Sequence, residues 1–202
     1  MSEGTKHTPV DERERRRHER FWYCVTIPND MVDRRNYAFE STTPTVHEDA
    51  FVARDATLVG DVRIEPDASV WPGVVLRGDV GTVRVGAESH VGDTAVFHAS
   101  EVGDRVMVGH GAVLNDATVE AGSLVGINAT LNSGATVGER SVIAAGTVLP
   151  DGFAVPPESF ARGVPATVVP LSETTVEPEE IASAYSSGAY TDLASRHEGL
   201  FE

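Results

Sequence analysis

The stretch that decides the fold is residues 85–114, VGAESHVGDTAVFHASEVGDRVMVGHGAVL, where an apolar residue recurs at nearly every sixth position. A period of six is neither the 3.6 of a helix nor the 2 of a strand, so it indicates a short strand followed by a sharp corner. Three such units form one coil of a triangular parallel β-helix. The period extends over residues 44–170, with inward anchors Val46, Val52, Leu58, Ile64, Val70, Leu76, Val85, Val91, Phe97, Val102, Val108, Leu114, Val119, Val125, Leu131, Val137, Ile143 and Leu149.

The length of a coil predicts which side chains lie above one another. Units of six, five and six residues make a coil of 17, so residues 17 apart should stack about 4.8 Å apart. One predicted stack contains His98, Asn115 and Asn132, each directly after an anchor. The period is interrupted at residues 77–84, which we expect to be irregular.

A second predicted stack, two residues after its anchors, contains Asp93, His110 and Ile127. His98 and His110 then lie on different edges of one prism. A single ion could bind both His98 and His110 only if a neighbouring subunit supplied one of these two histidines, as in a symmetric trimer.

Composition excludes several classes of function. The 31 acidic and 16 basic residues give a net charge of −15, which argues against nucleic acid or a membrane surface as partner. No apolar run is long enough for a membrane span or a secretory signal, so we expect a cytoplasmic protein. The single cysteine, Cys24, excludes a disulfide framework. An acidic chain with one lysine is typical of salt-adapted, halophilic proteins.

Two segments flank the repeats. Residues 1–43 are interpreted as a charged N-terminal extension, either a solvated helix with an aromatic anchor or a basic patch for an anionic partner. Residues 171–202 are predicted to form a C-terminal helix, because Pro178 and the acidic residues after it suit a first turn. Ile181, Tyr185 and Leu193 share one face, so this helix should pack along the prism.

Four stretches resemble the gamma-class carbonic anhydrases: Val70–Gly81 (VWPGVVLRGDVG), Val96–His98 (VFH), Val106–Leu114 (VMVGHGAVL) and Gly163–Ala166 (GVPA). The resemblance covers about residues 44–175. It implies an all-β fold, a left-handed parallel β-helix of hexapeptide repeats with a C-terminal helix. It also implies a homotrimer that reversibly hydrates carbon dioxide to bicarbonate, at zinc ions each held by two histidines of one subunit and one of its neighbour.

The resemblance also implies roles for individual residues. His98 and His110 match two of the three zinc ligands. Arg77, Asp79 and Asp93 match the Arg and Asp positions that brace the interface and the site.

The third ligand position departs from the family, because Asn115 stands where the family has a histidine. An amide is a weaker donor to zinc than an imidazole. His90 stands near the site where the family has Asn, so His90 is a candidate replacement ligand. The alternatives are a degraded, metal-free site and weak ligation by Asn115 or Asp116; iron or cobalt could also replace zinc. Gly92 replaces a family Gln that orients the metal-bound water, which predicts slower turnover.

Two other functions remain open at this point. Hexapeptide-repeat proteins include acyltransferases that bind acyl-coenzyme A between subunits, and His98 or His110 could serve as their general base. Alternatively, the changes at Asn115 and Gly92 fit a catalytically inactive structural trimer.

Overall fold

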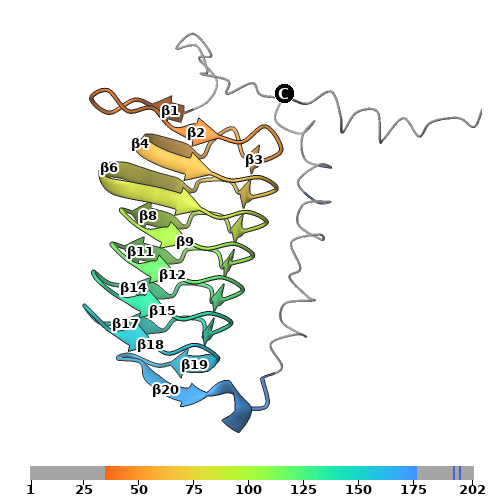
Figure 1. Ribbon diagram of the computed structural model, residues 1–202, viewed down its shortest axis with the longest axis vertical. Coiled ribbons are helices and arrows are strands. Elements are labelled where there is room, and N and C mark those ends of the chain that lie inside the picture. Colours follow the sequence, from red (N-terminus) through yellow and green to blue (C-terminus); the bar gives the residue numbers. More distant parts are fainter. Residues whose placement is uncertain (1–34, 177–192, 194–195, 197–202) are drawn as a thin grey trace, which may run out of the picture.

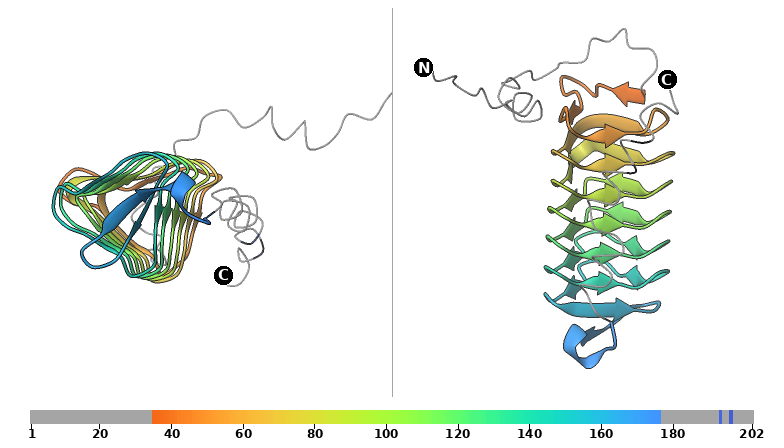
Figure 2. Two further views of the ribbon diagram at one scale, coloured as in Figure 1. Left: turned by 90° about the horizontal axis from the view of Figure 1, so that it is seen from below. Right: turned by 90° about the vertical axis from the view of Figure 1, so that its right-hand side faces the viewer.

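The computed structural model describes residues 35–176, 193 and 196, and these form a solenoid of stacked coils (Figure 1). Seen along its axis, the solenoid is triangular (Figure 2). The strand pairs between coils are parallel, and the antiparallel pair β19–β20 lies at the last coil. The triangular parallel β-helix predicted from the six-residue period is confirmed, as is the left-handed hexapeptide-repeat fold that the resemblance implies.

Two faces of the prism belong to one 12-stranded sheet. Its order, β17-β14-β11-β8-β6-β9-β12-β15-β18, passes from one face to the other through β6. The strands of this sheet are β1 (Arg35–Tyr37), β2 (Thr45–Val46), β4 (Thr57–Ile64), β6 (Val75–Val85), β8 (Val96–His98), β9 (Glu101–Val102), β11 (Val113–Asn115), β12 (Thr118–Val119), β14 (Thr130–Leu131), β15 (Thr136–Val137), β17 (Val148–Leu149) and β18 (Ala154–Val155).

The third face is an eight-stranded sheet with the order β20-β19-β16-β13-β10-β7-β5-β3. A short 3-10 helix, η1 (Leu171–Glu173), follows its last strand. The strands are β3 (Phe51–Val52), β5 (Ser69–Val70), β7 (His90–Val91), β10 (Met107–Val108), β13 (Leu124–Val125), β16 (Val142–Ile143), β19 (Ser159–Arg162) and β20 (Thr167–Pro170).

The core is a column of the predicted anchors, all of which are buried except Val46 and Val52, which are partly buried. Leu58, Leu76, Phe97, Leu114 and Leu131 are completely buried. Burying one such side chain stabilises the fold by about 1.5–3 kcal/mol, so the repeat itself supplies the stability of each coil. Side chains alternate between the two faces of a strand, and the residues on either side of an anchor therefore point outward.

The prediction that residues 77–84 are irregular is wrong. Val75–Val85 form the continuous strand β6, which pairs with β4 on the preceding coil. The register of this pair shifts between Gly60 and Val62, where the two strands turn the corner of the prism together. The six-residue period disappears here because a bent long strand replaces the usual break between two short strands.

The flanking segments lie mostly outside the described residues, so their boundaries stay predictions. Within residues 35–43, strand β1 pairs with β4 ahead of the first anchor. Of the predicted C-terminal helix, Leu193 and Arg196 are described, and both have helical backbone. Across the described part of the chain, no helix has the length and apolar character needed to span a membrane.

Candidate functional site

Arg77, His98 and Asn115 occupy equivalent positions on three successive coils. Arg77 on β6 is in register with His98 on β8, and His98 is in register with Asn115 on β11. Each follows a buried anchor, so each side chain points away from the core. The predicted stack of His98 and Asn115 is confirmed.

Asp79 links this stack into one cluster, called here the His98 cluster (Arg77, Asp79, His98 and Asn115). The Arg77 Nη2 donates to Asp79 Oδ2 at 2.7 Å, and Asp79 Oδ1 lies 3.2 Å from His98 Nε2. On the other side of the ring, His98 Nδ1 lies 3.1 Å from Asn115 Oδ1. The hydrogen bond from Arg77 holds the pKa of Asp79 below its ordinary value, so Asp79 is a carboxylate at neutral pH.

The two ring nitrogens of His98 face different oxygens. Nε2 lies 3.2 Å from Asp79 Oδ1, but neither atom has a hydrogen-bond partner in the described part of the chain. With the proton on Nδ1, His98 donates to Asn115 Oδ1 at 3.1 Å; with the proton on Nε2, Nδ1 and Asn115 Oδ1 present two lone pairs at that distance. Two ligands of a tetrahedral zinc ion lie about 3.4 Å apart, so the second state has nearly the spacing that a shared cation requires.

Asp93 and His110 form a separate pair on the next edge of the prism. His110 follows β10, and its Nδ1 accepts a hydrogen bond from the main-chain N–H of Asp93 at 2.9 Å. The same nitrogen lies 3.1 Å from Asp93 Oδ2. The His110 side chain is 51% exposed, so the rest of its ring is accessible to another molecule.

His90 lies inside the layer of side chains on the eight-stranded sheet. It is 4% exposed, with its Nδ1 3.1 Å from Ser69 Oγ and its ring centroid 5.5 Å from that of Trp71. Burial and, to a smaller extent, the nearby His110 together lower the pKa of His90 to about 3. His90 is therefore a neutral, packed imidazole next to the Asp93–His110 pair.

The described residues of one chain do not assemble a complete metal site. Among the described residues, no three His, Cys, Asp or Glu side chains converge on a point that could hold a metal ion. His98 ends a strand of the 12-stranded sheet, whereas His110 follows a strand of the eight-stranded sheet. The candidate ligands fit zinc only if His110 comes from a second subunit.

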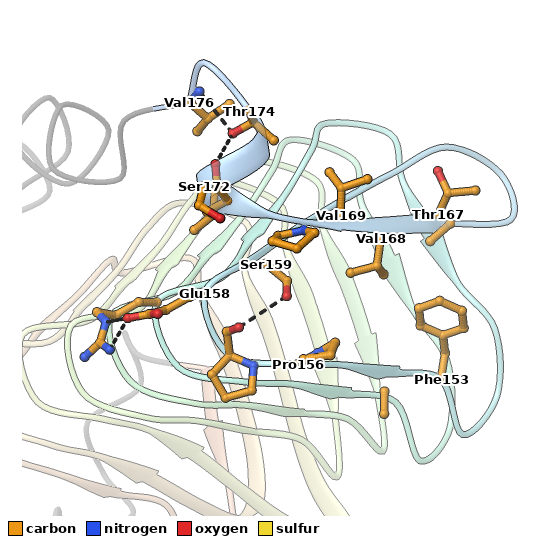
Figure 3. A pocket seen from close by; sticks show the side chains of 16 residues that line it. Phe153, Pro156, Glu158, Ser159, Thr167, Val168, Val169, Ser172, Thr174 and Val176 are labelled. Carbon is orange, nitrogen blue, oxygen red and sulfur yellow. Dashed lines mark hydrogen bonds and ion pairs between the residues drawn. The ribbon is translucent and has the colours of Figure 1, made fainter.

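A pocket of about 1280 Å³ lies at the C-terminal end of the solenoid, away from these clusters. Phe153 and Glu158 lie on opposite sides of it, and Val168, Val169 and other residues of the last strands form its wall (Figure 3). None of the residues predicted for the metal site lines it.

Stacked six-residue repeats with an outward Arg-Asp-His cluster define a hexapeptide-repeat solenoid protein. The chain is 36% identical over 166 residues to the mitochondrial gamma carbonic anhydrase 1 of Arabidopsis thaliana, a match that covers 76% of this chain and 59% of that protein. It is 34% identical over 173 residues to the carnitine operon protein CaiE of Escherichia coli, with coverage of 82% and 86%. The chain therefore belongs to the hexapeptide-repeat family that contains the gamma carbonic anhydrases and CaiE.

Solved structures show the same architecture. A Bacillus cereus protein described as a putative acetyltransferase superposes with a TM-score of 0.77 at 28% identity, over 83% of this chain and 99% of that one. A hexapeptide transferase family protein from Anaplasma phagocytophilum gives 0.75 at 30% identity with the same coverage. No protein-family profile matches the chain. The chain spans 59% of the length of the Arabidopsis proteins that it matches.

Sequence reasoning placed the two stacks but missed two sets of contacts around them. It did not find that Asp79 lies between Arg77 and His98, nor that Ser69 and Trp71 enclose His90. The signal for the first was available, since Arg77 and Asp79 are two apart on one strand and so share a face. The second depends on packing across neighbouring coils.

Proposed function

We propose that this protein reversibly hydrates carbon dioxide at a zinc site shared between two subunits of a homotrimer. His98 and Asn115 of one subunit and His110 of its neighbour would hold the metal. The convergence of His98 Nδ1 and Asn115 Oδ1 at 3.1 Å carries this proposal. Membership of the family that contains the gamma carbonic anhydrases supports it.

The residues of the His98 cluster prepare His98 for this role. Arg77 keeps Asp79 ionised, and this carboxylate, 3.2 Å from Nε2, favours the His98 tautomer with its proton on Nε2, in which Nδ1 would be the ligating nitrogen. Zinc, when bound with an open position, supplies Lewis acidity that makes water nucleophilic near neutral pH. The neutral amide of Asn115 donates more weakly than imidazole, so we expect weaker zinc binding than at a three-histidine site.

An apolar stripe beside the cluster supports a subunit contact there. Val75, Val96 and Val113 are in register on the same outer face as His98, and Val113 is exposed. Burial of this stripe against a second copy would bring the neighbour's Asp93–His110 edge toward His98. Light scattering should therefore give three times the 21.5 kDa chain mass; a monomer would exclude a shared site.

Metal analysis of protein purified without chelator tests the proposal directly. We expect zinc at up to one ion per chain, lost in His98→Ala and in His110→Ala, together with carbon dioxide hydration that follows the zinc content. His47→Ala is the matched control, because His47 contacts Asp49 on an early coil and belongs to neither cluster. Zinc retained by both site variants would contradict the proposal.

Acyl transfer is the second candidate, favoured by the two solved structures described as transferases. In that case His98 or His110 would act as general base toward an acyl-coenzyme A substrate. Saturable binding of coenzyme A without stoichiometric zinc would favour this reaction. An intact trimer that binds neither would instead identify a structural protein.

A further inference from the structure

The orientation of His110 has a consequence for its protonation state. Its Nδ1 accepts a hydrogen bond from the Asp93 main-chain N–H at 2.9 Å. A ring nitrogen that accepts from an N–H group carries no proton, so in the neutral imidazole the proton is on Nε2. The observed contact therefore selects the Nε2–H tautomer of His110.

This tautomer offers no free lone pair to a metal ion. Metal ligation requires an unprotonated nitrogen, but Nδ1 is engaged by Asp93 and Nε2 carries the proton. Ligation through Nε2 would move the proton to Nδ1, where it would point at the Asp93 N–H. The ring must leave this position before it binds, and Asp93 Oδ2, 3.1 Å away, is a ready acceptor for the Nδ1 proton.

Gly92 provides the space in which the ring sits. A Cβ atom at Gly92 would lie 2.9 Å from the His110 main-chain nitrogen and 3.0 Å from His110 Nδ1. Any side chain at this position would therefore compete with the ring for the same space.

The contact with a side chain distinguishes Gly92 from the glycines at the same turn of later coils. At Gly109 and Gly126 the nearest atoms are main-chain atoms of the following coil, at 2.6 and 2.4 Å. At Gly92 an imidazole nitrogen at 3.0 Å joins two main-chain atoms, the His110 nitrogen at 2.9 Å and the Val108 oxygen at 3.0 Å. Gly92 is thus tied to the orientation of His110 as well as to coil stacking.

We propose that Gly92, because it has no side chain, leaves room for the His110 ring in an orientation that cannot coordinate zinc. Gly92 thereby sets the zinc affinity of the intersubunit site. The zinc part rests on the proposed function, whereas the link between Gly92 and His110 is a property of the metal-free protein. The net stabilisation from one hydrogen bond to the main chain favours one ring orientation of His110 over the other by about two- to tenfold. Gly92→Ala should therefore tighten zinc binding by about that factor.

The first experiment uses the metal-free parent protein. Long-range proton–nitrogen NMR of His110, assigned with a His110→Gln variant, should show Nε2 protonated and Nδ1 unprotonated. In Gly92→Ala, the ring should lose this single tautomer. A parent ring protonated on Nδ1 would overturn the proposal without any variant.

The second experiment titrates Zn²⁺ into the parent, Gly92→Ala and Gly103→Ala. Gly103→Ala is the matched control, because its added Cβ would also lie 2.9 Å from a main-chain nitrogen, that of Ala121, and would touch no imidazole. The expected result is tighter binding in Gly92→Ala alone. Equal affinities in all three, or the same change in both variants, would overturn the role of Gly92. If no form binds zinc, the proposed function fails, while the tautomer measurement still decides whether Gly92 orients His110.

Discussion

Asn115→His should convert the intersubunit site into a three-imidazole zinc site. Asn115 ends β11 in register with His98, and its side chain points outward, so an imidazole can replace the amide without entering the core. The variant loses the hydrogen bond between Asn115 Oδ1 and His98 Nδ1, which contributes about 0.5–1.5 kcal/mol. We therefore expect the fold to survive the change.

The expected gain in zinc affinity follows from the number of ligands. Zinc-finger peptides bind zinc with about 10–16 kcal/mol through four ligands, or about 2.5–4 kcal/mol per ligand. Replacing a weak amide ligand by an imidazole should recover most of one such contribution. Because 1.4 kcal/mol corresponds to a factor of ten, Asn115→His should tighten zinc binding about 100- to 1000-fold.

The assay is competition with a chromophoric zinc chelator, followed by carbon dioxide hydration of the loaded protein. Asn132→His is the matched control, because Asn132 lies one coil further from His98. An equal gain in both variants would show that any added surface histidine binds zinc. No gain in Asn115→His would refute the assignment of Asn115 to the third ligand position.

The same titration separates Asn115 from His90 as the third ligand. If His90 completes the site, the parent already holds about one zinc per chain, His90→Ala releases it and Asn115→His changes little. The burial of His90 against Ser69 and Trp71 makes the opposite result our expectation. Zinc release by His90→Ala would contradict it.

Three further predictions concern stability and assembly. The pKa of His90 is lowered from 6.5 to about 3, so between these pH values the unfolded chain binds a proton that the folded chain does not. The free energy of unfolding should therefore fall by about 1.4 kcal/mol per pH unit as the pH drops through that window. Urea unfolding at pH 7, 5 and 4 should show a smaller fall in His90→Gln than in the parent, and an equal fall in both would refute this. With a net charge of −15, the melting temperature should rise from low to molar salt as screening weakens carboxylate repulsion, and a flat curve would contradict a salt-adapted surface. Deletion of residues 1–20, which contain no anchor, should leave the trimer intact by light scattering; loss of assembly would place this segment in the interface.

The sequence by itself determined the architecture of stacked six-residue repeats. Each six-residue unit carries its own anchor and corner, so the parallel stack of coils can be derived by counting residues. Counting also placed Asn115 beside His98 and His110 beside Asp93, because residues in equivalent positions of successive coils are in register.

The course of β6 and the orientation and burial of individual side chains depend on the tertiary structure and cannot be derived by counting residues. The continuous strand β6 departs from the period, since a long strand can bend around a corner where shorter ones would break. The burial of His90 arises from Ser69 and Trp71, which lie one coil earlier. The orientation of His110 depends on a main-chain N–H and on the space left by Gly92. A repeat specifies where each Cα lies, but the direction of a side chain depends on its neighbours in adjacent coils.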